Sequence, residues 1–571
     1  HVHFEESLEN GPLKEWLSRQ PNALVNAPIV ACTIDHLMPA TESTRGGRQI
    51  LPMLRLLTSD LVLDEIDDFD PADLHAVTRL VHWAGLLGSR VLLSSATLAP
   101  ALVQGLFQAY CAGREAYQCS WGESGLRVNI CCAWFDEFAN QANDCADSEG
   151  FHEAHQHFVE RRIKKLHQQP MFRHAKVIPI KHRDGKSLED ICETLVGTLY
   201  PAMHRLHRDN ALIDPETGKR LSVGLIRMAN IDPMVETAQR LVARSPEDGF
   251  ELHLSVYHSQ FPLLLRHTLE QRLDRLLRRD DPAKLFRDDE VRELLDGPKC
   301  SNQDLMLVVL ASPVAEVGRD HDYDWAIIEP SSMRAIIQLA GRVRRHRREA
   351  WNCVNLGLLS TNIKALEGKE IAFQRPGFET ASFKLRTHQL EELLRDEEQK
   401  RIDATWRIRA HDSPDQEYRL SDLEHAVLSD LMLGSDSQKQ VPVAWWWQTR
   451  AHLSGVLQGK HRFRKGAPTQ GYWLLPDEDT EGELRLYRRE RNHAEAIRCE
   501  NLRCFLEPEL AERCHWWSNV NEWALLKDYA EKNGLELGIC ARRYMTLELP
   551  AYGEGTGWCY HTSLGFSKRK H

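Results

Sequence analysis

An apolar run that ends in clustered carboxylates is the feature that most constrains this chain. Residues 61–68 read Leu-Val-Leu-Asp-Glu-Ile-Asp-Asp. A buried strand that delivers two adjacent acids to its carboxyl end can place one of them on Mg²⁺ and the other beside an attacking water. Taken alone, the pattern equally fits a strand followed by an acidic helix start, because Asp70 and Pro71 suit a first helical turn.

Further apolar runs on either side of this strand predict an open α/β sheet. Residues 27–34 and 90–94 are short continuous apolar runs suited to buried parallel strands. Residues 72–87 carry apolar side chains at helical spacing. Ligands of such sheets bind at the carboxyl ends of the strands, where the acid cluster and the Ser-Ala-Thr segment 95–97 both fall.

Length and composition predict several domains and no membrane span. The chain has 571 residues, of which 42% are hydrophobic and 27% charged, and its net charge is −11. No apolar segment reaches the roughly 18 to 20 residues that cross a bilayer, and the first residues lack the order of a signal peptide, so we expect a cytoplasmic location and no membrane partner. Local basic clusters could still line a nucleic-acid groove, although each alone also fits a solvated face: residues 342–348, 460–465, 488–491 and 568–570.

The 14 cysteines form no disulfide framework. Four of them lie in apolar runs, which predicts reduced and buried thiols: Cys32, Cys131, Cys132 and Cys353. One group could be imagined as a zinc site but lacks the spacing of a CxxC pair, so ordinary packing is the favoured interpretation: Cys499, Cys504, Cys514 and His515.

The acid cluster and the Ser-Ala-Thr segment resemble motifs II and III of superfamily 2 helicases. The resemblance implies that ATP and Mg²⁺ are the cofactors, with Asp64 as a metal ligand and catalytic residue and Glu65 as the residue that polarises the hydrolytic water. Asp67 would belong to the cofactor-binding residues. Ser95 and Thr97 would belong to the nucleic-acid-binding residues and would couple nucleotide state to strand movement.

Residues 33–37, Thr-Ile-Asp-His-Leu, resemble motif Ib of the same helicases. The resemblance implies that Thr33 binds the nucleic-acid backbone, since a hydroxyl and backbone amides at a strand end suit phosphate contacts without base selection. A turn-forming Thr-x-Asp is an equally common outcome.

A second α/β pattern follows from residue 176 and is expected to be a second RecA-like lobe. It contains a strand at 304–310 that leads into a segment resembling motif V, in which Ser312 would contact nucleic acid and Gly318 and Asp320 would contact the nucleotide. Its other expected strands and helices are as follows: strands at 176–180, 222–228, 252–257 and 325–328, and helices at 188–206, 235–242, 263–277 and 333–345.

The last of these helices carries Gln338-x-x-Gly341-Arg342-x-x-Arg345, which resembles motif VI. The resemblance implies that Gln338 binds the nucleotide. Arg342 and Arg345 would be catalytic, because arginines from the opposite lobe can neutralise the transferring phosphoryl group only when the lobes close. On an isolated helix, the same arginines would form an ordinary basic face.

A phosphate-binding loop of the form GxxxxGK[ST] does not precede Asp64. Residues 184–187, Asp-Gly-Lys-Ser, are a poor substitute because Ile180 stands where the first glycine belongs, and we predict a turn there. The expectation is therefore that this chain is the carboxyl-terminal portion of a larger protein, beginning inside its first RecA-like lobe.

The resemblance narrows to the CRISPR-associated type I helicase-nuclease. Motif V with Glu316 and the motif VI segment 341–346 carry it, although Pro313 and Leu339 depart from the residues common there. Residues 557–561, Gly-Trp-Cys-Tyr-His, and the tail 564–566 are similar to the type I-F branch.

This resemblance implies an ATP-dependent helicase that translocates on single-stranded DNA in CRISPR interference. The implied partners are single-stranded DNA, the crRNA-guided type I surveillance complex, a phage inhibitor protein, and a missing amino-terminal part with HD nuclease and integration-complex subunit domains. Nuclease activity is expected only if that part is present. Two alternatives stay open: a general superfamily 2 DNA or RNA helicase, and a fragment that binds DNA or a partner without hydrolysing ATP.

The expected domains follow one another along the chain: the second part of RecA-like lobe 1 at 1–110, a helical connector at 111–175, RecA-like lobe 2 at 176–370, a helical linker at 371–420 and a Trp-rich accessory domain at 421–571. Within the linker, 390–409 is expected to be one charged helix. Tryptophans of the accessory domain could stack on bases, but a place in the core is the favoured interpretation for each.

Overall fold

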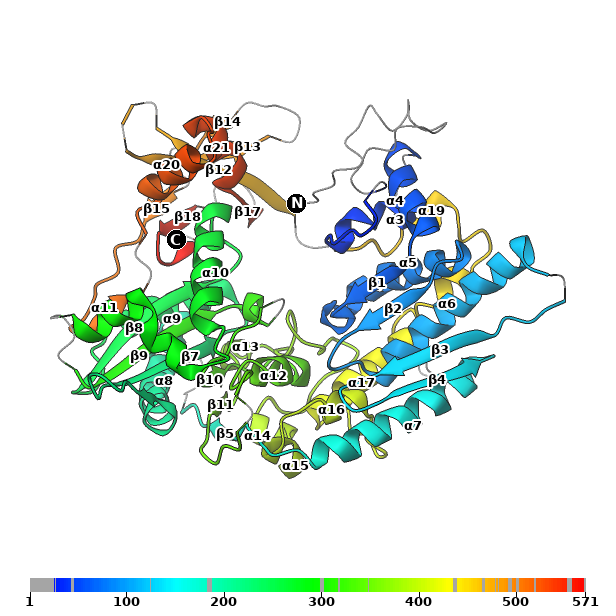
Figure 1. Cartoon of the computed structure of the whole chain (residues 1–571), viewed down its shortest axis with the longest axis horizontal. Helices are drawn as coiled ribbons and strands as arrows, with labels where there is room; N and C mark the ends of the chain where they lie inside the picture. Colours follow the sequence, from blue (N-terminus) through cyan, green and yellow to red (C-terminus); the bar gives the residue numbers. More distant parts are fainter. Residues whose placement is uncertain are drawn as a thin grey trace. The chain divides into compact units, whose positions relative to one another are not determined.

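The computed structural model (Figure 1) describes most of the chain, namely residues 25, 27–42, 46–123, 125–181, 187–297, 302–316, 319–347, 349–434, 439–464, 468–477, 479–480, 482–490, 496–499, 503–517, 520–551 and 557–568. The chain divides into two compact units. Unit 1 comprises 1–169, 404–416 and 421–466, and unit 2 comprises 170–403, 417–420 and 467–571. This grouping assigns the two parts of the predicted segment 421–571 to different units. The predicted domain boundaries stay a prediction.

Unit 1 is built around a short parallel sheet and the helices that cover it. Strands β1 (Leu61–Asp64) and β2 (Val91–Ser94) pair in parallel, with Asp64 opposite Ser94. Its helices are α3 (Pro39–Glu42), α4 (Gly46–Thr58), α5 (Leu74–Leu86), α6 (Pro100–Trp121), α7 (Ser148–His167), α16 (Thr405–Ile408), α17 (Leu420–Met432), α18 (Trp445–Gln448), α19 (Gly455–Gln458) and the short 3-10 helices η1 (Ile34–His36), η2 (Ile66–Asp68) and η3 (Pro71–Asp73). The predicted strands and the helix between them are confirmed.

A β-hairpin interrupts the segment that was expected to be a helical connector. Strands β3 (Ile130–Phe135) and β4 (Asn140–Cys145) pair antiparallel between α6 and α7. The hairpin and the two helices share a core cluster: Val103, Phe107, Trp134, Cys145, Phe151 and Phe158. The polar outer face of β4 hid this strand from a search for apolar runs.

The predicted strand at 27–34 is wrong. The segment is irregular up to η1, and the Ile29 side chain is 85% exposed. The Arg55 guanidinium donates hydrogen bonds to the carbonyls of Ala27 (2.5 Å) and Pro28 (3.2 Å), so this side chain binds carbonyls that a neighbouring strand would otherwise pair with. Because Pro28 has no N–H, it also cannot complete a strand ladder.

Three cysteines that were predicted to be buried are exposed, so that prediction is wrong for them: Cys32, Cys131 and Cys353. Cys132 is half-buried. The described cysteines are all free thiols, as predicted. Neighbouring residues of a strand point to opposite faces, so an apolar run does not bury every member when only one face is covered.

Unit 2 contains an eight-stranded, mostly parallel sheet with the order β16-β8-β9-β7-β10-β11-β5, in which β6 pairs antiparallel with β7. Its strands are β5 (Ala175–Ile178), β6 (Leu212–Ile213), β7 (Arg220–Arg227), β8 (Phe250–Tyr257), β9 (Asp304–Ala311), β10 (Trp325–Ile328), β11 (Leu356–Leu359) and β16 (Cys514–Trp516). Helices α8 (Leu188–Asn210) and α9 (Ile231–Val242) pack their apolar residues on one face of it. This arrangement confirms the predicted α/β, RecA-like fold class and every predicted strand of the second pattern.

The remaining helices of the sheet domain are α10 (Leu263–Leu277), α11 (Asp289–Asp296), α12 (Met333–Ala340), α13 (Ile363–Leu366), α14 (Leu390–Leu393), α15 (Asp396–Lys400), η4 (Pro282–Arg287) and η5 (Pro313–Ala315). Ser187 caps α8 through a capping box with Asp190. Residues 184–186 lie outside the described residues.

Two predicted helices are shorter than expected. The helix at 333–345 ends at Ala340, because the chain turns at Gly341 and Val343 then forms an isolated parallel bridge with Tyr323. The predicted helix at 390–409 is broken into α14, α15 and α16. Two of the charged side chains in this segment, Glu398 and Arg407, are buried.

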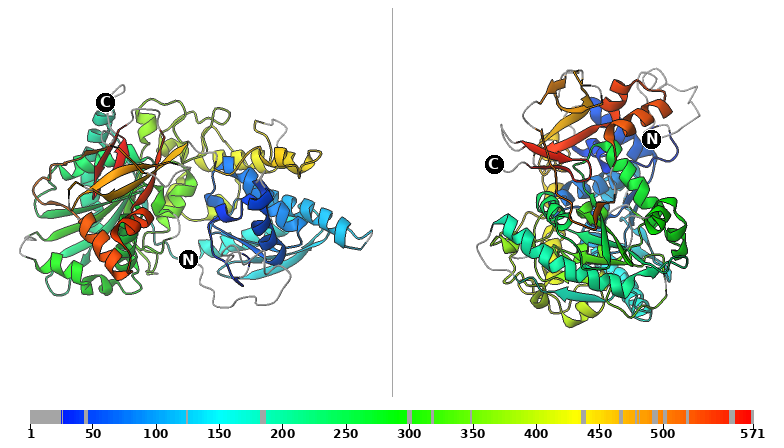
Figure 2. Two further views of the ribbon diagram at one scale, coloured as in Figure 1. Left: turned by 90° about the horizontal axis from the view of Figure 1, so that it is seen from above. Right: turned by 90° about the vertical axis from the view of Figure 1, so that its left-hand side faces the viewer.

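The carboxyl-terminal part of unit 2 adds two smaller sheets beside α10 (Figures 1 and 2), and Phe261 and Leu264 share a core with them. Its elements are β12 (Thr469–Pro476), β13 (Leu484–Arg489), β14 (Ala496–Arg498), β15 (Arg503–Phe505), α20 (Glu522–Lys532), α21 (Leu537–Tyr544), β17 (Thr546–Pro550), β18 (Trp558–His561) and β19 (Gly565–Lys568). Of the eight tryptophans for which a place in the core was favoured, four are buried, namely Trp446, Trp473, Trp517 and Trp558. The other four are half-buried: Trp445, Trp447, Trp516 and Trp523. Among the described residues, no helix is long and apolar enough to cross a membrane.

Candidate functional site

The acid turn, residues 64–68, begins where β1 ends. Glu65 adopts a left-handed conformation with φ of 50°, and its N–H donates to the carbonyl of Ser94 at 2.7 Å. A non-glycine residue in this region of φ/ψ space is uncommon and redirects the chain sharply. The turn therefore leaves Asp64 exposed at the strand end and begins η2 directly behind it.

Hydroxyls from the segment after β2 bind the acid turn. The Ser95 and Thr97 hydroxyls donate to the two carboxylate oxygens of Asp67. Ser95 Oγ also lies 3.3 Å from Glu65 Oε2, to which it donates. Asp67 and Thr97 are buried, so the ends of both strands are joined by charge-assisted hydrogen bonds.

The electrostatics of the acid turn act mainly on Glu65. Burial raises the pKa of Glu65, and the charges of Asp68, Asp67 and Asp64 raise it further, while the Ser95 hydrogen bond lowers it. No arginine or lysine is among these causes. A carboxyl group with a raised pKa is suited to acid–base chemistry, and the oxygen-rich cluster offers the ligand type that Mg²⁺ prefers.

Thr33 lies at the surface of the same unit, directly before η1. Its carbonyl accepts the N–H of His36 at 3.0 Å, and its side chain makes no capping bond. Arg464 fixes the region from a distant part of the sequence, because its side chain pairs with Asp35 at 3.0 Å and its N–H donates to Asp73 at 2.6 Å. Sequence reasoning missed this contact, which connects residues far apart in the chain.

In unit 2, the segment resembling motif V follows the carboxyl end of β9. Ser312 is buried, and its N–H donates to the carbonyl of Tyr257 at 3.0 Å. Glu316 pairs with Arg227 at 2.7 Å, and both side chains are buried. Gly318 lies outside the described residues. The Ser312 side chain is therefore enclosed in this state.

The predicted arginines of motif VI have different environments. Arg342 is buried and donates to two carbonyls of the motif V segment, to that of Glu316 at 2.6 Å and to that of Arg319. Arg345 is 42% exposed and pairs with Asp320 at 2.6 Å. Gln338 lies one turn earlier on α12. Arg342 thus holds the loop, and Arg345 is the arginine with an accessible guanidinium.

A buried cluster of acids and arginines lies beside this pair. Arg347 pairs with Asp322 (2.6 Å) and Asp324 (2.7 Å), and Arg279 pairs with Asp324 at 2.5 Å. Burial by itself would raise the pKa of Asp324, but Arg279 and Arg347 lower it to about 2. The basic cluster at 342–348 is therefore largely an internal network, and the sequence analysis did not anticipate these pairs.

The structure brings the predicted residues of unit 1 together, but not all of those of unit 2. In unit 1 the cluster consists of Asp64, Glu65, Asp67, Ser95 and Thr97. In unit 2, Ser312 follows the carboxyl end of β9, whereas Asp320, Arg342 and Arg345 lie around the loop that leads into the amino end of β10, where the Arg345 N–H donates to Asp322. Gln338 lies in the last turn of α12. The assignment of roles to these residues stays a prediction.

Comparisons with known proteins identify relatives over the whole chain. Residues 220–348 match the family model of the CRISPR-associated nuclease/helicase Cas3, C-terminal, and residues 474–568 match that of the CRISPR-associated Cas3 subtype I-F/YPEST-like, C-terminal domain. The CRISPR-associated nuclease/helicase Cas3 subtype I-F/YPEST of Pseudomonas aeruginosa is 50% identical over 100% of this chain and 52% of its own length. The protein of the same name from Pectobacterium atrosepticum is 46% identical over 84% of this chain and 44% of its own length.

Among solved structures, the crystal structure of T. fusca Cas3-ADP matches 94% of this chain and 52% of its own chain. The TM-score is 0.48 and the sequence identity is 16%, so this structure is too distant to inform the site. The chain spans about half the length of the curated relatives it matches. The close sequence relatives confirm the expected type I-F branch. The whole-chain relatives and the two family models support the expected assignment to the type I-F Cas3 helicase-nucleases.

Proposed function

We propose that this chain supplies ATP-driven translocation on single-stranded DNA, and DNA unwinding, in CRISPR type I interference. The observation that carries the proposal is the hydrogen-bonded link between the acid turn and the strand end after β2, through Asp67, Ser95 and Thr97. A link of this kind transmits a change at the nucleotide to the neighbouring strand. The close Cas3 relatives, whose name includes helicase, support the same assignment.

The acid turn fits a bound Mg²⁺ and ATP. The mutual repulsion that raises the pKa of Glu65 is relieved when a divalent cation lies beside these carboxylates. When bound, Mg²⁺ would neutralise charge on the phosphates. Asp64, which is exposed at the strand end, would hold the ion, while Glu65 would accept the proton of the attacking water.

Residues of unit 2 would complete the reaction. Arg345 would leave Asp320 and bind the transferring phosphoryl group, since a pair of half-exposed side chains is weak and readily exchanged. Gln338, Gly318 and Asp320 would contact the nucleotide. Arg342 would keep the motif V segment in place.

Nucleic acid would be bound through backbone contacts. Thr33 is exposed at the start of η1, and its hydroxyl would donate to a phosphate, as would Ser312 after a local rearrangement. Ser95 and Thr97 would transmit the nucleotide state to this contact. Such contacts carry no base selection, which suits a translocating enzyme.

The proposed partners follow from the family. They are a crRNA-guided type I surveillance complex that loads the DNA, an HD nuclease domain and an integration-complex subunit domain in the part of the relatives that this chain does not cover, and a phage inhibitor protein. Degradation of foreign DNA would require the nuclease domain.

DNA-stimulated ATP hydrolysis by the full protein that carries this chain tests the proposal. We expect Glu65→Gln to reduce the rate by about 10²- to 10⁴-fold, the usual contribution of a general base. Asp60→Asn is the control, because Asp60 precedes β1 and pairs with Arg90 at the surface. An unchanged rate in Glu65→Gln would refute the mechanism, and DNA binding without any hydrolysis by the unmodified protein would favour the non-hydrolysing alternative.

A further inference from the structure

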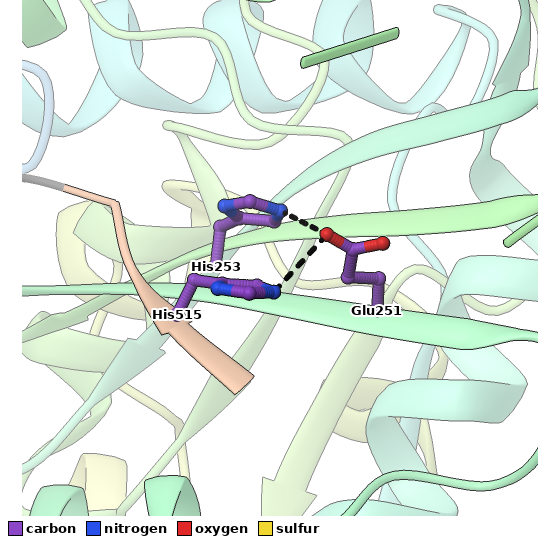
Figure 3. A group of neighbouring side chains, drawn as sticks. All are labelled: Glu251, His253 and His515. Atoms are coloured by element: carbon purple, nitrogen blue, oxygen red, sulfur yellow. Dashed lines mark hydrogen bonds and ion pairs between the residues drawn. The ribbon is translucent and has the colours of Figure 1, made fainter. Parts of the chain in front are cut away.

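Three potential metal ligands converge near one edge of the large sheet in unit 2. Glu251 and His253 belong to β8, and His515 belongs to β16. One donor atom of each lies within 4.8 Å of the other two. In Figure 3 both imidazole rings turn a nitrogen toward the same carboxylate oxygen of Glu251.

Strand register produces this convergence. Residues two apart on a strand share a face, so Glu251 and His253 lie on the same side of β8. β16 pairs in parallel with β8, and His515 is the direct partner of His253. The three ligands are thus held by paired strands rather than by a loop.

The donor distances suit a tetrahedral ion. Oε1 of Glu251 lies 3.0 Å from Nε2 of His253 and 3.3 Å from Nε2 of His515. Bonds of about 2.0 to 2.1 Å in tetrahedral geometry separate two ligand atoms by about 3.3 Å. The two distances from Glu251 therefore match those in a tetrahedral site. The imidazole rings stack with centroids 4.9 Å apart and 27° between their planes, so they must rotate to direct both Nε2 atoms at one ion.

The burial and hydrogen bonding of the three side chains resemble those of metal ligands in known proteins. Glu251 and His253 are 2% and 6% exposed, and a buried carboxylate needs a cationic or hydrogen-bonding partner. The Asn302 amide donates to the other Glu251 oxygen at 3.4 Å, which orients the carboxylate as outer groups of metal sites do. His515 has a side chain that is 41% exposed, so an ion and a water ligand can enter from that side.

We propose that Glu251, His253 and His515 bind a Zn²⁺ ion whose fourth ligand is water. Two imidazoles with one carboxylate favour Zn²⁺ over Mg²⁺ or Ca²⁺. The site is separate from the proposed nucleic-acid contact, because Glu251 lies near the amino end of β8, whereas Ser312 follows the carboxyl end of β9. It is also separate from Arg345, which lies beside the start of β10, because β9 and β7 stand between β8 and β10 in the sheet. The ion would anchor β16, which comes from the carboxyl-terminal part of the chain, to the central sheet.

The cysteines considered with His515 in the sequence are not part of this site. Cys514 points to the opposite face of β16, where its sulfur lies 3.7 Å from the Tyr200 hydroxyl and joins the apolar core. The partners of His515 come instead from more than 250 positions earlier in the chain. A search for local ligand spacing could not find them.

The test measures zinc bound to the full chain after removal of metal by a chelator and dialysis against Zn²⁺. The chain has 27 histidines, so the informative quantity is the difference between variants. We expect His515→Ala to lose about one equivalent of tightly bound Zn²⁺, with binding at this site weakened by about 100-fold or more. His267→Ala is the matched control, because His267 is exposed on α10 and outside the cluster.

Cobalt spectroscopy and thermal unfolding make the result independent of folding defects. Co²⁺ bound to the unmodified chain should show the strong visible bands of tetrahedral coordination, and His515→Gln should lose them while its far-ultraviolet circular dichroism is unchanged. Zn²⁺ should raise the unfolding midpoint of the unmodified chain and of His267→Ala but not of His515→Gln. Equal zinc binding by all variants would overturn the proposal, as would a preference for Fe²⁺ over Zn²⁺.

Discussion

Two acid-rich segments of this protein lie at strand ends, one after β1 and one before β10, and they differ in which groups bind their carboxylates. The acid turn after β1 is bound by the hydroxyls of Ser95 and Thr97, and burial and neighbouring carboxylates raise the pKa of Glu65. Before β10 in unit 2, Asp322 and Asp324 are bound by buried arginines, which lower the pKa of Asp324 to about 2.

The difference distinguishes acids that stabilise the fold from acids that remain available for chemistry. A carboxylate that is permanently paired with arginine cannot accept a cation or a proton without breaking the pair. A carboxylate that accepts hydrogen bonds from hydroxyls, as Asp67 does from Ser95 and Thr97, keeps its negative charge. Both segments are rich in acidic residues in the sequence. Only the residues that bind the carboxylates, hydroxyls in one segment and arginines in the other, distinguish them.

Arg345 gives the largest expected effect, because it is the arginine of the second segment that would leave its partner. Arg345→Ala should reduce DNA-stimulated ATP hydrolysis by about 10³-fold or more, the contribution of an arginine that stabilises phosphoryl transfer. Its surface pair with Asp320 adds little to stability. Steady-state hydrolysis and circular dichroism of the same sample check both points.

The control for Arg345 is Arg287→Ala, since Arg287 forms a comparably exposed pair with Asp281 in the same unit. Hydrolysis by this control should match that of the unmodified protein. If Arg345→Ala hydrolyses ATP as fast as Arg287→Ala, Arg345 belongs with the purely structural arginines.

Asp324→Asn tests whether the acids before β10, which pair with buried arginines, stabilise the fold. The change leaves Arg279 and Arg347 buried with less negative charge, so we expect the free energy of unfolding to fall by about 3 to 5 kcal/mol. Urea denaturation measures this loss. Asp281→Asn, at the surface, should change it by less than about 1 kcal/mol.

The same variant should alter the acid limb of stability. Because the pKa of Asp324 is lowered in the folded state to about 2, its stabilisation is present above the unfolded pKa of about 3.9 and is lost as the pH falls through 2. Asp324→Asn should therefore flatten the decline of stability over that interval. If stability declines with falling pH to the same extent in Asp324→Asn, groups other than Asp324 cause the loss of stability in acid.

The sequence predicts β1 and β2 of unit 1 and β5, β7, β8, β9 and β10 of unit 2, because apolar runs of four to eight residues are typical of buried parallel strands. It does not predict the β3–β4 hairpin or the strands of the carboxyl-terminal part. It fails at 27–34, where Arg55 binds the backbone carbonyls, and at 341–345, where the chain turns to reach Tyr323. Both failures arise from contacts with residues distant in sequence.

The candidate sites show the same limit. The sequence placed the acid cluster and the Ser-Ala-Thr segment at the carboxyl ends of two strands, and these strands are neighbours in the structure. The hydrogen bonds of Ser95 and Thr97 to Asp67 were not predicted. The pairing of Arg347 with Asp324 and the convergence of His515 on Glu251 depend on strand order and register. No local pattern encodes that order.

Thr97→Val tests whether the hydrogen bond from Thr97 to Asp67 couples ATP hydrolysis to DNA unwinding. The substitution keeps the buried shape but removes the hydroxyl that donates to the charged Asp67, at a cost of about 1.5 to 3 kcal/mol. We expect DNA unwinding per ATP hydrolysed to fall, because the link between the acid turn and the strand after β2 is weakened. A strand-displacement assay and a hydrolysis assay on one preparation give this ratio.

Thr78→Val is the control for that measurement. The Thr78 hydroxyl is buried in α5 and has no hydrogen-bond partner among the described residues. Its replacement should leave both stability and coupling nearly unchanged. Equal effects of the two variants would mean that loss of a hydroxyl in this core, and not loss of the link, lowers unwinding.

The smallest expected effect is a shift in the pH dependence of hydrolysis. Glu65 would act as a carboxylate, so its activity is lost as the pH falls through its folded-state pKa, which burial and the neighbouring acids place above the ordinary value of 4.5. Asp68 contributes the largest charge effect on this pKa. Asp68→Asn should therefore move the acid limb of the kcat/KM profile to lower pH, whereas Asp60→Asn should leave it in place, and a limb that does not move would show that another group controls it.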